Sequence, residues 1–371
     1  MTTCMGAACA LLPEGSEEKR GGGHVQPGPQ VTCGLTARWS RQRRDWRVRA
    51  AAHRENARHP PASSGLDMRD RSLVSRSGQR SAAPVMAAVG FCAMSAVFAA
   101  QAPRQQPNIV RQIDHILIAS SEAKELFLLL SDTFQFPVVW PMSDYGSFAS
   151  GGVAVGNVNL EVVKASESAA GAVRSRFVGF ALEPEPLRTS LPELEARGIP
   201  HGAPTPFRSR QPNGSITTRW TTVGLPGVSG DTVEVFLCEY EHDVPARRRR
   251  LLEQLRSRDG GPLSVHAIRE IIYGAADVKR MQEHWQELLN PLQASSQGVW
   301  PVGAGPAIRV VQADKDEIRG LVVNVKSLQQ ARRFLKEHGL LGTEQPAALT
   351  VAGSQLQGLN VTLVEEPPGG V

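Results

Sequence analysis

Four short apolar stretches decide the fold of this chain: IDHILI at residues 113–118, FVGFAL at 177–182, IREIIY at 268–273 and IRGLVV at 318–323. Each is bounded by polar or turn residues, which is typical of a buried strand. An amphipathic helical pattern follows each stretch, over about residues 122–133, 187–197, 278–289 and 328–338. Short strands then lead to a last apolar strand at 158–163, 233–240, 308–311 and 359–364. The chain therefore contains four copies of one βαβββ layout.

The repeat predicts an α+β fold with two domains. A single βαβββ unit cannot bury both its helix and its sheet face, so the units must pair. Two paired units make a curved mixed sheet around a cleft, with the helices outside. We expect one domain over 108–242 and a second over 262–366. The segment 243–261 between them contains Arg247 to Arg250 and a leucine spacing that predicts a short, solvated linker helix.

The charge of the chain is concentrated at its start. The formal net charge is +5, but residues 1–80 hold 14 of the 41 basic and 7 of the 36 acidic side chains. The rest of the chain is slightly negative, which excludes a nucleic-acid-binding role for the folded part. Residues 1–80 are rich in Gly, Pro, Ser and Arg without apolar periodicity, which predicts a disordered basic extension.

An uncharged apolar segment follows this extension. Residues 81–103 carry no charge and end in Ala100-Gln101-Ala102, after several arginines. This pattern is typical of a secretory signal peptide, so residues 81–107 are interpreted as signal peptide and linker, with translation starting at Met68 or Met86. We expect an exported protein, periplasmic or secreted, without a stable membrane span after cleavage. The alternative is a membrane anchor formed by residues 81–103.

Three motifs within the repeat resemble the vicinal oxygen chelate superfamily, and its glyoxalase-like branch in particular. They are Asp114-His115-Ile116 in the first strand, 159–162 (NLEV) in the last strand of the first unit, and 236–240 (FLCEY) in the second unit. The resemblance implies two glyoxalase/extradiol-dioxygenase-like domains, each built from two βαβββ units. It also implies metal ligands on the first and last strands of each unit.

The ligand positions of the first unit fall on His115 and Glu161. Strand alternation places His115 on one face with Ile113, and Asp114 on the other with Ile116. In the second unit the opening position is Gly179, which cannot ligate. The closing strand offers Glu239, with Glu234 as the alternative.

The resemblance therefore implies a divalent metal (Zn, Mn, Ni or Mg) held by His115, Glu161 and Glu239. A metal-dependent lyase or isomerase acting on a small vicinal-oxygen substrate would follow, with Glu161 or Glu239 as general base. An extradiol dioxygenase is less favoured because a second histidine is missing.

A binding protein without metal is the competing hypothesis, since some members of this superfamily sequester small molecules. Four aromatic residues lie between the strands of the first domain and are predicted to wall a substrate pocket: Trp140, Tyr145, Phe148 and Trp220. The chain could also form a homodimer.

The second domain has Glu270, Arg309, Gly320 and Thr362 at the equivalent positions. These four residues cannot bind a metal as a group, so a degenerate second copy is expected. Cys238 is expected on the packed face of its strand, where it would be inert.

Overall fold

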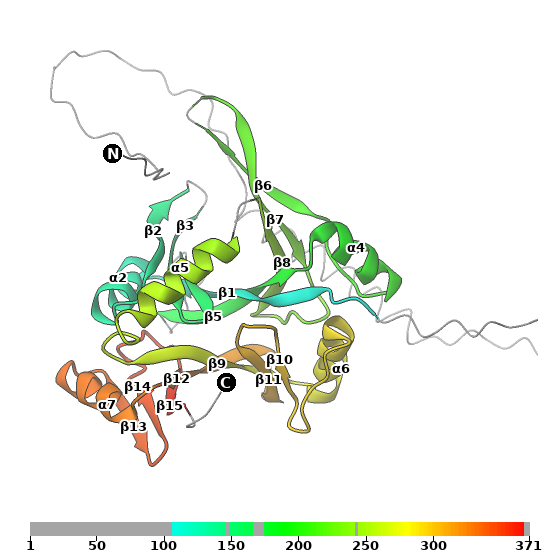
Figure 1. Cartoon of the computed structure of the whole chain (residues 1–371). Helices are drawn as coiled ribbons and strands as arrows, with labels where there is room; N and C mark the ends of the chain where they lie inside the picture. The colour runs from blue at the N-terminus through cyan, green and yellow to red at the C-terminus, as the bar shows by residue number, and fades with distance from the viewer. Residues whose placement is uncertain (1–105, 146–147, 166–173, 212, 242–243, 367–371) are drawn as a thin grey trace, which may run out of the picture.

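The computed structural model describes residues 106–145, 148–165, 174–211, 213–241 and 244–366 (Figure 1). The predicted basic extension and nearly all of the predicted signal segment lie outside these ranges. No helix among the described residues is long and apolar enough to span a bilayer.

The first two units form one sheet of eight strands, called sheet A, in the order β2-β3-β4-β1-β5-β8-β7-β6. Its strands are β1 (Val110–Ser120), β2 (Val138–Asp144), β3 (Ala149–Val155), β4 (Val158–Lys164), β5 (Ser175–Pro184), β6 (Thr205–Arg210), β7 (Ile216–Gly224) and β8 (Glu234–Tyr240). The central pair β1 and β5 is antiparallel, and each strand pairs in parallel with the last strand of its own unit. Helix α2 (Ala123–Leu128), extended by a π-helical turn (Leu129–Thr133), and helix α4 (Leu187–Ala196) belong to these units.

The last two units form a second mixed sheet, called sheet B, in the order β10-β11-β9-β12-β15-β14-β13. Its strands are β9 (Val265–Ala275), β10 (Val299–Pro301), β11 (Ala307–Gln312), β12 (Glu317–Val325), β13 (Leu341–Gln345), β14 (Ala348–Val351) and β15 (Val361–Glu365). Only two strands follow helix α6 (Val278–Leu289), whereas three follow helix α7 (Leu328–Glu337). The prediction of four equal βαβββ units is therefore wrong for the third unit.

The helix starts in sheet B follow from local capping chemistry. The Asp277 side chain accepts the Arg280 N–H at the start of α6, and the Ser327 side chain accepts the Gln330 N–H at the start of α7. Each cap satisfies one of the backbone donors that a first helical turn leaves without a partner. The predicted helix ranges 278–289 and 328–338 are confirmed to within a residue or two.

Sheet A is strongly curled. Strands β2 and β6 are its two edges, and the edges of a flat sheet of eight strands would lie about 34 Å apart at a spacing of about 4.8 Å. The ring centroids of Phe148, just before β3, and Phe207, in β6, are only 6.3 Å apart. The two outer hairpins therefore meet over one face of the sheet.

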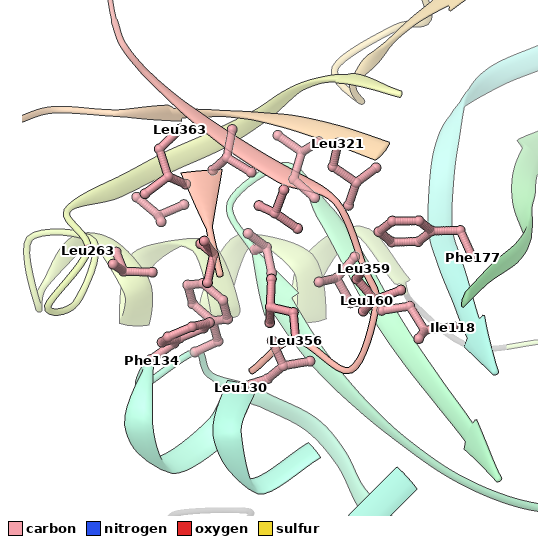
Figure 2. Close-up of a pocket in the computed structure, with 17 residues that line it drawn as sticks. Ile118, Leu130, Phe134, Leu160, Phe177, Leu263, Leu321, Leu356, Leu359 and Leu363 are labelled. Atoms are coloured by element: carbon pink, nitrogen blue, oxygen red, sulfur yellow. The ribbon is translucent and has the colours of Figure 1, made fainter. Parts of the chain in front are cut away.

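The opposite face of sheet A packs against sheet B, and the two sheets share one apolar core (Figure 1). A cavity of about 40 Å³ lies in this core and is lined by apolar side chains from both sheets. Figure 2 shows the labelled side chains of both sheets pointing into it, among them Ile118 and Leu160 from sheet A and Leu321 and Leu363 from sheet B.

Candidate functional site

A β-bulge in β1 decides which side chains reach the curled face of sheet A. The pairing of β1 with β5 shifts register between Ile113 and His115, so two residues of β1 oppose one residue of β5. Ile113 and Ile116 both lie in the shared core. Asp114 and His115 therefore both point to the other side, which we call the His115 face. The expectation that Asp114 would lie opposite His115 is wrong, because it assumed an unbroken alternation.

His115 is held by a carboxylate at each ring nitrogen. Its Nδ1 lies 2.7 Å from Asp114 Oδ2, and its Nε2 lies 3.3 Å from Glu161 Oε2. The side chains of Asp114 and His115 are 2% and 5% exposed, and that of Glu161 is 15% exposed. Glu161 reaches His115 because β4 runs parallel to β1, with Glu161 beside Leu117 and therefore one step along the same face. The structure thus brings His115 and Glu161 together.

The inter-domain helix α5 (Val244–Arg256) also contributes to this cluster. Arg248 donates to Asp114 Oδ1 at 2.7 Å and to Glu183 Oε2 at 2.9 Å. The Tyr240 hydroxyl donates to Asp114 Oδ2 at 3.1 Å. In Figure 1, α5 crosses in front of sheet A, and these bonds show that it is anchored there. The expectation of a solvated linker helix is therefore wrong for the face of α5 that bears Arg248.

Burial and these contacts shift several pKa values in a consistent way. Burial favours the neutral form of both Asp114 and His115, but their mutual hydrogen bond and charge interaction outweigh it. Arg248 and Tyr240 also favour the Asp114 carboxylate, so its pKa is lowered, while Glu161 helps to raise the pKa of His115. Burial, with the charge of Asp114 next, raises the pKa of Tyr240 well above its ordinary value. The carboxylates of Asp114 and Glu161 thus favour the protonated form of the His115 imidazole.

Glu239 lies outside this cluster. Its Oε1 accepts the backbone N–H of Leu187, the first residue of α4, at 2.9 Å. The carboxylate satisfies a backbone N–H of the first helical turn and interacts favourably with the helix dipole. The N-cap residue of α4, Pro186, has no side-chain acceptor that could do the same. The prediction of Glu239 as a metal ligand or general base is therefore wrong, because its side chain points to the helix-covered side of β8.

The pairing registers identify the true counterparts of His115 and Glu161 in the second unit. Leu117, two residues after His115, pairs with Glu161. Ala181, two residues after Gly179, pairs with Phe236. Phe236 is therefore the residue equivalent to Glu161, and its ring lies edge-on to the His115 ring with centroids 5.9 Å apart. The predicted position, Glu239, is thus three residues away from the position that strand pairing gives.

A catalytic metal does not fit these residues. Gly179 and Phe236, which take the two positions of the second unit, provide no ligand. Glu234, the alternative ligand, pairs with Gly179 at the start of β8, and among the described residues no three His, Cys, Asp or Glu side chains are grouped closely enough to hold a metal ion.

Gly179 has a packing role instead. A Cβ at this position would lie 2.0 Å from the Glu234 carbonyl oxygen of β8. The glycine thus allows β5 and β8 to approach closely beside the site.

In sheet B, the positions equivalent to His115 and Glu161 are occupied by Glu270 and Arg309. The carboxylate therefore lies on the opening strand and the cation on the closing strand. β9 has its own bulge at Arg269 and Glu270, and Arg309 pairs with Ile272 two residues after Glu270. Arg309 donates to Glu270 through Nε at 2.6 Å and through Nη2 at 3.0 Å. Burial favours the neutral form of Glu270, but Arg309 and Arg269 outweigh it and lower its pKa. The carboxylate of the second domain is thus matched by a permanent cation.

Aromatic side chains surround the cluster on the His115 face. Trp140 lies over Gly152, which pairs with Glu161. The rings of Tyr145 and Phe148 stack with centroids 5.0 Å apart, and those of Phe207 and Trp220 with centroids 4.1 Å apart. The structure therefore places the four aromatic residues of the predicted pocket around the curled face.

Phe207 and Tyr240 complete this aromatic set, and the sequence reasoning did not select them. Tyr240 lies beside Trp220, with ring centroids 6.4 Å apart. Side chains alternate along β8, so Tyr240, four residues after Phe236, is expected on the same face as Phe236.

Cys238 also lies on the His115 face, in a small apolar cluster with Leu117, Ala181 and Phe236. The expectation that it faces the shared core is therefore wrong. Burial, followed by the charge of Asp114, raises its thiol pKa well above the ordinary value. The thiol consequently stays protonated and is a poor nucleophile.

Comparisons with known proteins identify similar solved structures only. No family model and no curated protein matches the chain. A 4-hydroxymandelate synthase variant from Streptomyces coelicolor has a TM-score of 0.48 and 11% identity, covering 70% of this chain and 93% of that one. The 2,3-dioxygenase LapB from Pseudomonas sp. KL28 has a TM-score of 0.45 and 10% identity, covering 70% and 93%. A hypothetical protein from Staphylococcus aureus has a TM-score of 0.46 and 8% identity, covering 68% and 99%.

Proposed function

We propose that this chain is a protein of the vicinal oxygen chelate fold that binds a small molecule on the His115 face without a metal. The fold assignment is supported by the two curved mixed sheets, each with a central antiparallel pair flanked by the last strands of its units. One observation carries the binding role. His115 is paired with two carboxylates while Phe236 occupies the fourth ligand position, on a face walled by aromatic rings.

The described residues indicate how a ligand would be held. Trp220 and Phe207 are half-buried and stacked, so they offer an apolar surface for a flat ligand. Glu161 contacts His115 through one oxygen, and its partial exposure leaves the carboxylate able to accept a hydrogen bond from a ligand hydroxyl or amide. Asp114 fixes the orientation of the His115 ring. Such a site combines an apolar wall with a few oriented polar groups.

The proposal includes export. The uncharged segment 81–103 and the small-residue motif Ala100-Gln101-Ala102 support cleavage of a signal peptide and release of the folded part.

Binding of benzamide tests the function, because this compound has a flat ring and an amide donor. Ligand-observed NMR on the full chain is expected to show binding that is unchanged after dialysis against EDTA. Glu161→Leu and Trp220→Ala are expected to weaken it at least tenfold, since each removes one side of the recognition.

Ile216→Ala is the control variant, because Ile216 is 61% exposed at the start of β7. Binding that disappears with EDTA and returns with zinc would overturn the metal-free site. Equal affinities of Trp220→Ala and Ile216→Ala would place the ligand elsewhere.

A further inference from the structure

The first arginine of the inter-domain helix differs from the other three in its surroundings. Arg247 is half-buried, and its guanidinium carbon lies 5.9 Å from the centroid of the Tyr240 ring. Arg249 and Arg250 are exposed. Arg248 is paired with Asp114 and Glu183. The run of four arginines therefore contains one cation that faces the site and is not used by the carboxylates of the cluster.

Helical periodicity explains why Arg247 points inward. Leu251 and Leu255, four and eight residues after it, are the buried residues of α5. Positions at this spacing share one face of a helix. Arg248 fixes the same end of the helix through its bonds to β1 and β5. The direction of Arg247 is thus set by the packing of the whole helix.

Arg247 forms no ion pair with the residues that the structure describes. In the described part of the chain, no carboxylate lies within ion-pair distance (4.0 Å) of its guanidinium, whereas Arg111 and Arg248 each contact two carboxylates. Arg247 is nevertheless close enough to the cluster for its charge to act on His115. Removing a guanidinium partly from water without an anionic partner is unfavourable, and an anion bound at this position would offset that cost.

We propose that the ligand of the His115 face is a small organic anion, whose carboxylate pairs with Arg247 and whose flat apolar body lies against Trp220. This rests on the proposed binding function and adds the charge of the ligand. Tyr240 lies between the two recognition elements, in contact with Trp220 on one side and Arg247 on the other. Arg247 belongs to α5 and not to sheet A, so the inter-domain helix supplies the specificity residue of the first domain.

The test compares benzoate with benzamide, which have nearly the same shape and differ in charge. In the full chain we expect benzoate to bind roughly 10- to 100-fold more tightly, as a charge-assisted hydrogen bond to an arginine would provide. Arg247→Gln should reduce benzoate affinity to that of benzamide and leave benzamide binding unchanged. Arg247→Lys should retain part of the preference, because it keeps the charge but not the planar fork.

Arg250→Gln is the matched control, since Arg250 is an exposed arginine of the same helix. Equal affinities for the two compounds in the unmodified chain, or equal effects of Arg247→Gln and Arg250→Gln, would overturn the proposal while leaving the binding function standing. Absence of binding by both compounds would contradict the binding function and the proposal together. Thermal unfolding of Arg247→Gln should match that of Arg250→Gln, which separates lost recognition from lost folding.

Discussion

Replacing Arg248 with alanine should destabilise the chain by about 2 to 4 kcal/mol. The bond to Asp114 is 2.7 Å long and joins side chains that are 18% and 2% exposed, and a buried charge-assisted bond of this kind contributes about 1.5 to 3 kcal/mol. The second bond, to Glu183, contributes about 1 kcal/mol or less, because Arg111 and Gln112 also donate to that carboxylate. Asp114 keeps His115 and Tyr240 as partners, so the full penalty of an unpaired buried charge does not apply.

Thermal unfolding followed by circular dichroism measures this effect. The apparent midpoint should fall by about 4 to 16 °C, at about 2 to 4 °C per kcal/mol for a folded region of this size. Arg250→Ala is the control and should change the midpoint by less than about 2 °C, because exposed substitutions have small effects. If Arg248→Ala and Arg250→Ala unfold at the same temperature, α5 is not anchored to the acidic cluster and the reasoning about the site is wrong.

Three further predictions follow from the same contacts. Glu239→Ala should cost about 1 kcal/mol in urea unfolding through loss of the α4 cap, while Glu239→Gln should cost less and neither should alter benzamide binding. Stability should decline as pH rises above about 6.5 through the raised pKa of His115, and also in acid as Asp114 protonates through its lowered pKa. His115→Asn should abolish the decline that begins at about pH 6.5, and a decline there that persists unchanged in this variant would contradict the assignment. The raised pKa values of Cys238 and Tyr240 contribute a separate decline only at more alkaline pH. Gln357→Ala should cost about 2 kcal/mol or more in urea unfolding, because the Gln357 side-chain oxygen accepts from two buried serines of sheet A; a loss below about 0.5 kcal/mol would exclude this inter-sheet contact.

The helices were predictable because their signals are local. The ranges 187–197, 278–289 and 328–338 agree with α4, α6 and α7 to within a residue or two. Each combines an apolar stripe at helical spacing with a cap or a glycine at its end, and both features depend on neighbours within a few residues. The expected pairing of units into two curved mixed sheets also followed, because a lone unit cannot bury its own sheet.

The site was predictable only in its first half. His115 and Glu161 were identified correctly as neighbours, since both lie in strands of the same unit whose ends are well marked. The sequence predicts Glu239, with Glu234 as the alternative, at the position that Phe236 occupies, because the closing strand of the second unit has no signal that fixes its register. A displacement by an odd number of residues moves every side chain to the other face of a sheet. The error of three residues therefore assigned a ligand role to Glu239, which caps helix α4 on the other face.

The sequence by itself determined the opening strand, the helix and the closing strand of each unit, and the concentration of positive charge in the first 80 residues. These properties depend on composition and on periodicity over ten or so residues. Only the tertiary structure decided that Asp114 joins His115 on one face, that Phe236 replaces a ligand, and that α5 brings Arg247 and Arg248 to the site. The physical reason is that a single extra residue in β1 reverses strand alternation. In addition, Asp114 and Arg248 are 134 residues apart in sequence, so only the folded chain brings them together.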